Sequence, residues 1–494
     1  MRKQTKLVAV LSAAALLALG ASMTSFAAGW EKDDAGIWHY YDNDDNMVTD
    51  EWKKDGGKWF YLDEDGDMAT DSWVDDDYYV GADGAMLTNQ WIKTMADEDA
   101  DDPDDDGEHW FYFNSKGKKV TDDKKKINGK TYYFNSDGEM RDGWYEDEGD
   151  VYYLGDEDDG ARATGWLWLD EPGSEDDEDE DGKPDHDSDC EICDSEGWYY
   201  FGSDGKMYQD SSKKKKVNGK YYYFNNHGQM LYEWINTKES KGTVDFALDG
   251  DATAAEADMI YANEVEDGSR AAGWYEIDGA EDRGNDNDTD WYYFKKGEAK
   301  KASKTDAADE QTDSTGATQY RKKIKIEGKY YCFNEDGQMQ TGLQRIDGKT
   351  YYFDDNGVMK TGKMTVDDDN DDTFTFYFST KNNDNGKGYN GIKDNYLYAD
   401  GQRLEADDDY AVYKFGNSLY VVNKSGKIQK STGKKYELDG GDGYVTVNSN
   451  GTFNKYYTDD EKDTVATTLP QDVIRTGGYE TATNEKTDGF WWEP

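Results

Sequence analysis

The sequence predicts an all-β protein, a solenoid of repeated β-hairpins with long acidic loop insertions. Three observations lead to this prediction. A short aromatic phrase recurs along the chain, a Gly-containing turn follows it at a fixed distance, and acidic residues gather between the phrases. A single hairpin is only marginally stable in water, so each unit must bury its aromatic face against a neighbour. We therefore expect a row of small cores.

The repeated phrase is clearest at 348–362, which reads GKTYYFDDNGVMKTG. Its aromatic triplet favours a strand, and Asn356-Gly357 favours a tight turn. We expect Val358–Lys360 to return as the second strand of the hairpin. The methionine two residues after the turn glycine is a flexible apolar filler, predicted to pack under the next hairpin. Near copies of the phrase occupy 57–71, 129–143, 219–233 and 328–342.

Composition limits the classes of function. The chain has 494 residues and a formal net charge of −53, which disfavours nucleic acid and anionic lipid as partners and favours cations. Only 35% of the residues are hydrophobic, yet 15% are aromatic. A disordered acidic chain is poor in aromatic residues, so this composition indicates many small aromatic cores in series.

The N-terminus has the pattern of a secretory signal peptide. Three basic residues precede an apolar run at 7–19, and small residues at 25–27 predict cleavage after Ala27. That run is too short to span a membrane, and no second one follows, so we expect no membrane span after signal removal. No apolar tail follows TLPQD at 468–472. The mature protein is therefore expected to be secreted and to hold its target at the cell surface non-covalently.

Aromatic content divides the mature chain into four parts. We expect Trp-rich hairpin repeats with acidic insertions over 28–299, a linker over 300–320 and Tyr-rich repeats over 321–378. Divergent hairpins are expected over 379–494. Fourteen of the 16 tryptophans lie between Trp30 and Trp291. Any function of tryptophan is therefore expected in the first repeat region.

The repeats resemble a known family. The segment 143–166, GWYEDEGDVYYLGDEDDGARATGW, and the phrase at 348–362 are similar to the cell-wall-binding repeats of Gram-positive surface proteins, of the choline-binding and glucan-binding types. The resemblance covers about 30–364. It implies a superhelical solenoid in which choline sits between neighbouring hairpins in a cage of aromatic rings. Each ring attracts a quaternary ammonium by about 0.5–2 kcal/mol, and many weak sites on one polymer give avidity.

The resemblance also implies which residues form the cages. One tryptophan belongs to a Gly-Trp strand and the other heads the aromatic triplet. The implied pairs are Trp30 with Trp38, Trp52 with Trp59, Trp91 with Trp110, Trp166 with Trp198, and Trp274 with Trp291. Trp73 and Trp144 lack a tryptophan partner, and Tyr78 or Tyr152 would serve instead. The alternative is that these aromatics only form the core of the stack.

Hairpins near 130, 220, 329 and 349 have Thr or Tyr where the second tryptophan would stand. They resemble the glucan-binding type, or they are purely structural. Along the strand at 59–62, alternation predicts Trp59 and Tyr61 on one face and Phe60 and Leu62 on the other.

The acidic insertions suggest calcium as the one candidate cofactor. Spaced aspartates before a glycine are how calcium loops gather oxygen ligands. The candidate ligands are Asp102, Asp104, Asp106, Asp177, Asp179, Asp181 and Asp185. A plain solvated loop is the alternative. Cys190 and Cys193, near His186, could bind zinc, although export favours a disulfide. Cys332 replaces an aromatic residue and is expected to be structural.

The sequence therefore predicts a non-catalytic, secreted wall-binding protein of a Gram-positive bacterium. Its partner would be a cell-wall polymer, either choline-substituted teichoic acid or glucan. The alternative is a surface adhesin or structural protein that uses the repeats as an anchor and its acidic loops for outward interactions. An enzyme is the third hypothesis, but none of the four histidines lies in a catalytic pattern.

Overall fold

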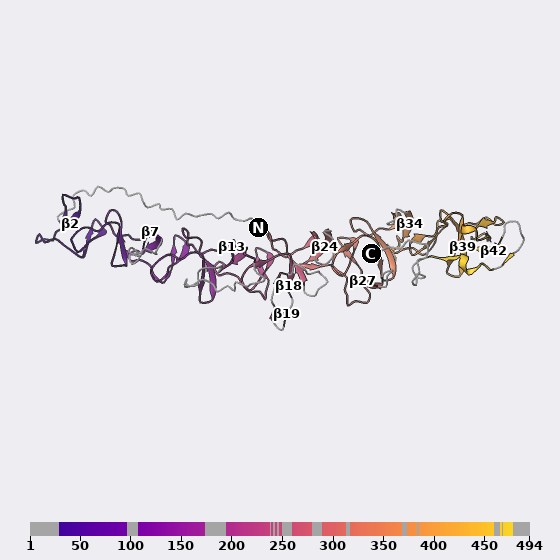
Figure 1. Ribbon diagram of the computed structural model, residues 1–494, viewed down its shortest axis with the longest axis horizontal. Helices are drawn as coiled ribbons and strands as arrows, with labels where there is room; N and C mark the ends of the chain where they lie inside the picture. The colour runs from indigo at the N-terminus through magenta and orange to yellow at the C-terminus, as the bar shows by residue number, and fades with distance from the viewer. Residues whose placement is uncertain are drawn as a thin grey trace.

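A computed structural model gives the fold. It describes residues 29–95, 107–172, 194–237, 259–278, 289–312, 317–367, 373–382, 385–458 and 468–477, and the short strands 239–240, 243–244, 247–248 and 465–466. In this part of the chain the fold is all-β apart from two 3-10 turns, η2 (Asp439–Gly441) and η3 (Gln471–Val473). Figure 1 shows small sheets following one another along one long axis, from β2 to β42. The predicted fold class is confirmed.

Most of the sheets contain only two antiparallel strands. They are β1 (Trp30–Lys32) with β2 (Trp38–Tyr40), β3 (Glu51–Asp55) with β4 (Lys58–Leu62), β5 (Ser72–Val74) with β6 (Tyr78–Val80), β7 (Gln90–Thr94) with β8 (His109–Phe113), β9 (Lys124–Ile127) with β10 (Lys130–Tyr133), β11 (Trp144–Asp147) with β12 (Asp150–Tyr153), β13 (Gly165–Asp170) with β14 (Glu196–Phe201), β19 (Glu239–Ser240) with β20 (Thr243–Val244), β26 (Glu310–Thr312) with β27 (Thr318–Tyr320), and β31 (Gly342–Ile346) with β32 (Lys349–Phe353).

Four further sheets add a short third strand. They are β15 (Lys215–Val217), β16 (Lys220–Phe224) and β17 (Met230–Leu231); β21 (Ala247–Leu248), β18 (Trp234–Asn236) and β22 (Met259–Tyr261); β23 (Gly273–Asp278), β24 (Thr289–Lys295) and β25 (Glu298–Ala299); and β28 (Lys322–Ile326), β29 (Lys329–Phe333) and β30 (Met339–Gln340).

The sheets are larger toward the C-terminus. They comprise the five strands β33 (Gly362–Asp367), β34 (Thr373–Phe378), β37 (Gln402–Arg403), β36 (Tyr396–Ala399) and β35 (Gly391–Lys393); the three strands β39 (Ser418–Asn423), β38 (Tyr410–Phe415) and β44 (Ile474–Thr476); and the four strands β40 (Tyr436–Glu437), β41 (Tyr444–Val447), β42 (Phe453–Tyr457) and β43 (Val465–Ala466). Strand β44 pairs in parallel with β38, so the last described segment returns to an earlier hairpin.

The hairpin is offset from the predicted one. The first strand precedes the phrase, and the tight turn lies at Asp347-Gly348, both with positive φ. After Asn356-Gly357 the chain makes only one bridge, from Phe353 to Met359. The expected second strand at Val358–Lys360 is therefore wrong. The reason is that the Met359 amide donates to the carbonyl of Tyr330, 2.9 Å away in the preceding repeat.

This backbone bond recurs and joins each repeat to the one before it. The Met68 amide donates to the carbonyl of Trp38, and the Met86 amide to that of Trp59, both at 2.8 Å. The methionine side chain then packs under the next repeat. A Cβ placed on Gly66 would lie only 2.9 Å from the Met47 sulfur, and Gly66 has φ +81°. The predicted packing of the methionine is confirmed, and it explains the turn glycine.

The strands alternate as predicted. Phe60 and Leu62 are buried, whereas Trp59 is 39% exposed and Tyr61 is half-buried. Buried residues of this kind form a row of separate small cores along the solenoid. One face of each hairpin therefore holds the stack together, and the other is available for the aromatic residues of a site.

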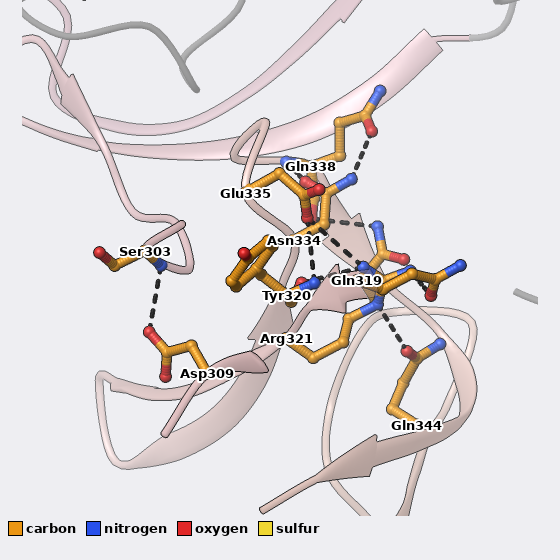
Figure 2. Close-up of polar contacts among 10 residues, drawn as sticks. Ser303, Asp309, Gln319, Tyr320, Arg321, Asn334, Glu335, Gln338 and Gln344 are labelled. Carbon is orange, nitrogen blue, oxygen red and sulfur yellow. Dashed lines mark hydrogen bonds and ion pairs between the residues drawn. The ribbon is translucent and has the colours of Figure 1, made fainter. Parts of the chain in front are cut away.

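Residues 300–320, predicted as a linker, contain the hairpin β26–β27. Arg321, at its end, is buried and donates to the side chains of Gln319 and Gln344 at 3.1 and 3.2 Å (Figure 2). The Tyr320 amide donates to the Glu335 carboxylate. These bonds tie the segment to the hairpins on its C-terminal side.

Candidate aromatic cages

Hairpin β3–β4 builds the first candidate site on its exposed face. In the strand register Trp52 lies opposite Tyr61, and Lys54 lies opposite Trp59. Opposed residues and residues two apart share a face, so all four side chains stand together. The Trp52 ring lies 5.2 Å from that of Tyr61 and 5.6 Å from that of Tyr78, which belongs to the next hairpin. We call Trp52 the strand tryptophan, Trp59 the head tryptophan and Tyr78 the third wall.

Three other hairpins repeat this arrangement. Strand tryptophan Trp91 lies 6.4 Å from head tryptophan Trp110 and 4.9 Å from its third wall, Tyr132. Trp274 lies 6.5 Å from Trp291 and 4.7 Å from Tyr331. In the fourth hairpin, Trp166 lies 4.8 Å from Tyr222, with Trp198 as the head tryptophan. Ring contacts thus join the predicted pairs Trp91–Trp110 and Trp274–Trp291. The register sets the other two pairs on one strand face, and each of the four hairpins gains a third wall.

The sequence reasoning missed the third wall because it comes from the following repeat. Its signal was available, because the third wall directly follows the head position of the next repeat, as Tyr132 follows Thr131 and Tyr331 follows Tyr330. Trp168 and Trp234 were also missed. Trp234 follows a glutamate as Trp52 does, and it contacts Tyr261 and Tyr292 at 5.1 and 5.8 Å.

The four cages differ in accessibility. Trp59 and Trp291 are 39% and 41% exposed, whereas Trp198 is 2% exposed. Trp198 belongs to a buried cluster with Val217, Tyr222, Phe224 and Met230. Trp168 also stands opposite it, with the two rings 5.6 Å apart. Trp110 is half-buried, and its Nε1 donates to Asp158 at 3.2 Å. The cages at Trp52–Trp59 and Trp274–Trp291 are therefore open, and the cage at Trp198 is closed.

The predicted partners of Trp73 and Trp144 are not brought against them. Trp73 contacts Tyr79 at 5.4 Å and Phe111 at 4.9 Å, whereas Tyr78 lies against Trp52. Likewise Trp144 contacts Tyr153 and Tyr199 at 5.4 and 4.9 Å. Tyr152 instead lies 5.6 Å from Tyr133. The register explains this, because it sets Tyr79 and Tyr153 directly opposite the two tryptophans.

The first predicted pair lies at the start of the described chain. Trp30 is buried against Tyr40 and Phe60, with ring centroids 5.2 and 5.5 Å away. Trp38 is half-buried, and the Lys32 ammonium lies 5.4 Å from its ring. Trp30 therefore belongs to the core between the first two hairpins.

Charge differs at the rims of the two open cages. The ammonium of Lys54 lies 5.4 Å from the Trp59 ring. In the other cage, the same register position opposite Trp291 holds the exposed Glu276. At the cage of Trp91 and Trp110, whose head tryptophan is half-buried, hydrogen bonds from Trp110 and Lys93 lower the pKa of the Asp158 carboxyl, which therefore stays ionised. A cationic ligand would meet a different charge at each site.

The geometry suits a compact cation with no hydrogen-bond donors. Trp274 is inclined by 70° to Trp291 and by 58° to Tyr331, so the three rings are not stacked as parallel faces. Aromatic faces attract a cation through their quadrupole, and a quaternary ammonium needs no acceptor.

The calcium and zinc predictions lie outside the described residues. This holds for the two aspartate loops, for Cys190, Cys193 and His186, and also for the signal peptide at 1–27. Within the described ranges, no three His, Cys, Asp or Glu residues are grouped so that they could hold a metal ion. Cys332 is fully buried, and burial raises the pKa of its thiol to about 12, which agrees with a packing role.

Helices able to span a membrane are absent from the described part of the chain.

Three family profiles match parts of the sequence. Two describe a choline-binding repeat; the first matches 46–85 and 68–95, and the second matches 123–166 and 340–384. The third, a putative cell wall binding repeat, matches 105–119, 192–207 and 215–230. These matches identify the repeats as members of the choline-binding, cell-wall-binding repeat family. No curated protein sequence matches the chain.

Solved structures from Streptococcus pneumoniae also resemble the chain. The modular autolysin LytC is 20% identical, covering 68% of this chain and 52% of its own, with a TM-score of 0.33. Choline binding protein F, crystallised in the presence of a peptidoglycan analogue, is 20% identical over 74% of this chain and 100% of its own, with a TM-score of 0.34. The choline-binding domain of CbpL is 26% identical over 42% and 97%, with a TM-score of 0.25. The chain thus spans about half the length of LytC.

Proposed function

We propose that the chain is a non-catalytic, secreted protein that binds non-covalently to a Gram-positive cell wall through choline groups of a wall polymer. The observation that carries the proposal is the pair of open three-ring cages at Trp52–Trp59–Tyr78 and Trp274–Trp291–Tyr331. The family of the repeats supports a wall polymer as the partner.

Ring inclination favours choline over glucan. A sugar ring is flat and stacks on one broad aromatic face, and it needs polar groups beside that face. Trp52 is instead inclined by 65° to Tyr78, and Trp274 by 70° to Trp291. Crossed walls of this kind leave room for a compact, roughly spherical trimethylammonium group.

The net charge also favours a cationic group. At −53 the chain attracts a choline headgroup and repels the phosphates that carry it. Three rings at about 0.5–2 kcal/mol each make a weak single site. Two or more cages on one chain that engage the same polymer raise the overall affinity without any new contact.

Binding to purified walls tests the proposal. The protein should bind walls that contain choline and be released by millimolar choline, whereas soluble glucan should not release it. Replacing both Trp59 and Trp291 by Ala should weaken retention at least tenfold, because each open cage loses one ring. The fold should survive, since both head tryptophans are exposed and contribute to no core. The matched control is Ile392→Ala, which removes an equally exposed apolar side chain (42%) in the C-terminal region.

Three outcomes would count against the proposal. Release by glucan alone would make the ligand a carbohydrate. Equal retention of the double variant and the parent would remove the cages from binding. Soluble fragments released from walls during incubation would contradict the non-catalytic part.

A further inference from the structure

Hairpin β5–β6 lacks a head tryptophan but keeps the other two walls of the cage. Next to the open cage of Trp52 lies the junction between β5–β6 and β7–β8. Here Trp73 is the strand tryptophan and Phe111 is the third wall, with their rings 4.9 Å apart. Extending the register of β5 and β6 by one pair sets Asp77 in the place of the head tryptophan. The junction is a cage that lacks one ring.

A cation of the chain itself lies against these two walls. The Lys119 ammonium is 5.1 Å from the centroid of Trp73 and 5.9 Å from that of Phe111. Lys119 occupies the methionine position of its repeat, since it bridges to Phe113 as Met86 bridges to Val80. Its Cδ lies 3.1 Å from where a Cβ on Gly138 would be, so its stem packs as a methionine would.

A second junction is filled from a different position. Lys323 lies opposite Cys332, at the register position that Trp52 holds opposite Tyr61. Its ammonium is 4.0 Å from the centroid of Tyr351, the third wall supplied by the next hairpin, and 5.3 Å from that of Tyr330. Lys323 is half-buried, and within the described ranges no carboxylate lies at ion-pair distance from it.

We propose that these incomplete cages are filled from within, with the ammonium groups of Lys119 and Lys323 in the place of the ligand cation. Binding is thereby restricted to junctions that carry both tryptophans. This inference rests on the proposed function, because it assumes that the complete cages take a cation. Lys54, in an open cage, differs because it is exposed and reaches the ring of Trp59 rather than the two walls Trp52 and Tyr78.

Tethering explains why the internal cation prevails. A lysine on the same chain is present at a high effective concentration, commonly millimolar or more. A free choline that gains only a few ring contacts cannot displace it at ordinary concentrations. The ammonium comes from the methionine position in one junction and from the strand-tryptophan position in the other. The same filling is therefore reached from two different local sequences.

Counting bound choline on the full chain tests the inference. Equilibrium dialysis with labelled choline gives the number of sites at saturation. Lys119→Met should add one site, because methionine keeps the packing against Gly138 and removes the cation. The control is Lys116→Met, which changes the net charge equally but removes an exposed lysine of the preceding turn. The control should leave the count unchanged.

The second position gives an independent measurement. Lys323→Ala should also add one site, whereas Lys329→Ala, which removes an exposed lysine from the paired strand, should not. A folded Lys119→Met protein with the parental count, or an equal gain in Lys116→Met, would overturn the inference. Lys323→Ala decides the matter should Lys119→Met not fold. If the parent binds no choline, the proposed function fails, while a gain in either variant would still support filling from within.

Discussion

Hairpins β3–β4 and β13–β14 each carry a strand tryptophan and a head tryptophan in the same register, yet only the first leaves a ring for a ligand. Trp59 and Trp198 both stand at the head of an aromatic triplet and face a residue two positions after a strand tryptophan. That residue is Lys54 in one hairpin and Trp168 in the other. Trp168 covers Trp198 with its ring, whereas the flexible Lys54 leaves Trp59 exposed. The tryptophan pair is thus not sufficient for an open cage.

The largest expected difference between these hairpins is in stability. Trp198→Ala should lower the free energy of unfolding of its part of the solenoid by about 3–5 kcal/mol, since it removes a large buried side chain. Trp59→Ala removes an exposed ring and should cost less than about 1 kcal/mol. Hydrogen exchange of the β4 and β14 amides in each variant would measure both, because repeats open locally. Equal losses would contradict the distinction between open and closed cages.

The sequence predicted the fold class and the faces of the strands, because both follow from local alternation. It did not predict the offset of the hairpin. The strand-like segment after Asn356-Gly357 bonds to Tyr330 of the preceding repeat, and sequence alternation does not reveal which neighbour a strand will choose. The same limit hid the third walls, since Tyr78 and Tyr331 come from hairpins that the tryptophans do not pair with.

The candidate site was predictable in its tryptophan pairs and unpredictable in its accessibility. Trp91 and Trp110, and Trp274 and Trp291, come together although long acidic insertions separate them in the sequence. Antiparallel pairing tolerates an insertion at the hairpin end, because the register depends on the strands. Whether a cage is open depends on the residue opposite the head tryptophan, on packing against the next repeat, as at Trp198, and on internal cations such as Lys119.

Exchanging that opposing residue should exchange the behaviour of the two hairpins. Trp168→Lys should uncover Trp198 and add one choline site, and Lys54→Trp should remove one. The expected weakening at the covered cage is tenfold or more, about 1.4 kcal/mol, which corresponds to losing one or two ring contacts. Dialysis with labelled choline again gives the count. Trp168 also donates to Glu196 at 2.6 Å, so Glu196→Ala serves as the control for loss of that bond alone. Unchanged counts in both exchanged variants would show that another residue closes the cage.

The smallest expected effect concerns the charge at the rims of the two open cages. Lys54 and Glu276 hold the same register position, so Lys54→Glu should strengthen choline binding at its cage and Glu276→Lys should weaken it at the other. Two unit charges 4 Å apart in water interact by about 1 kcal/mol, and both side chains are exposed, so each change should alter affinity about two- to fivefold. Binding measured by titration calorimetry at low and at high salt separates the effects, since a Debye length of about 3 Å at 1 M salt removes the charge effect and leaves the ring contacts. Lys53→Glu is the matched control, because Lys53 lies on the opposite face of the strand and pairs with Glu51 at 2.9 Å. An equal change in this control would mean that the affinity for choline depends on the net charge of the chain. The residue at the rim would then not cause the difference in affinity between the cages.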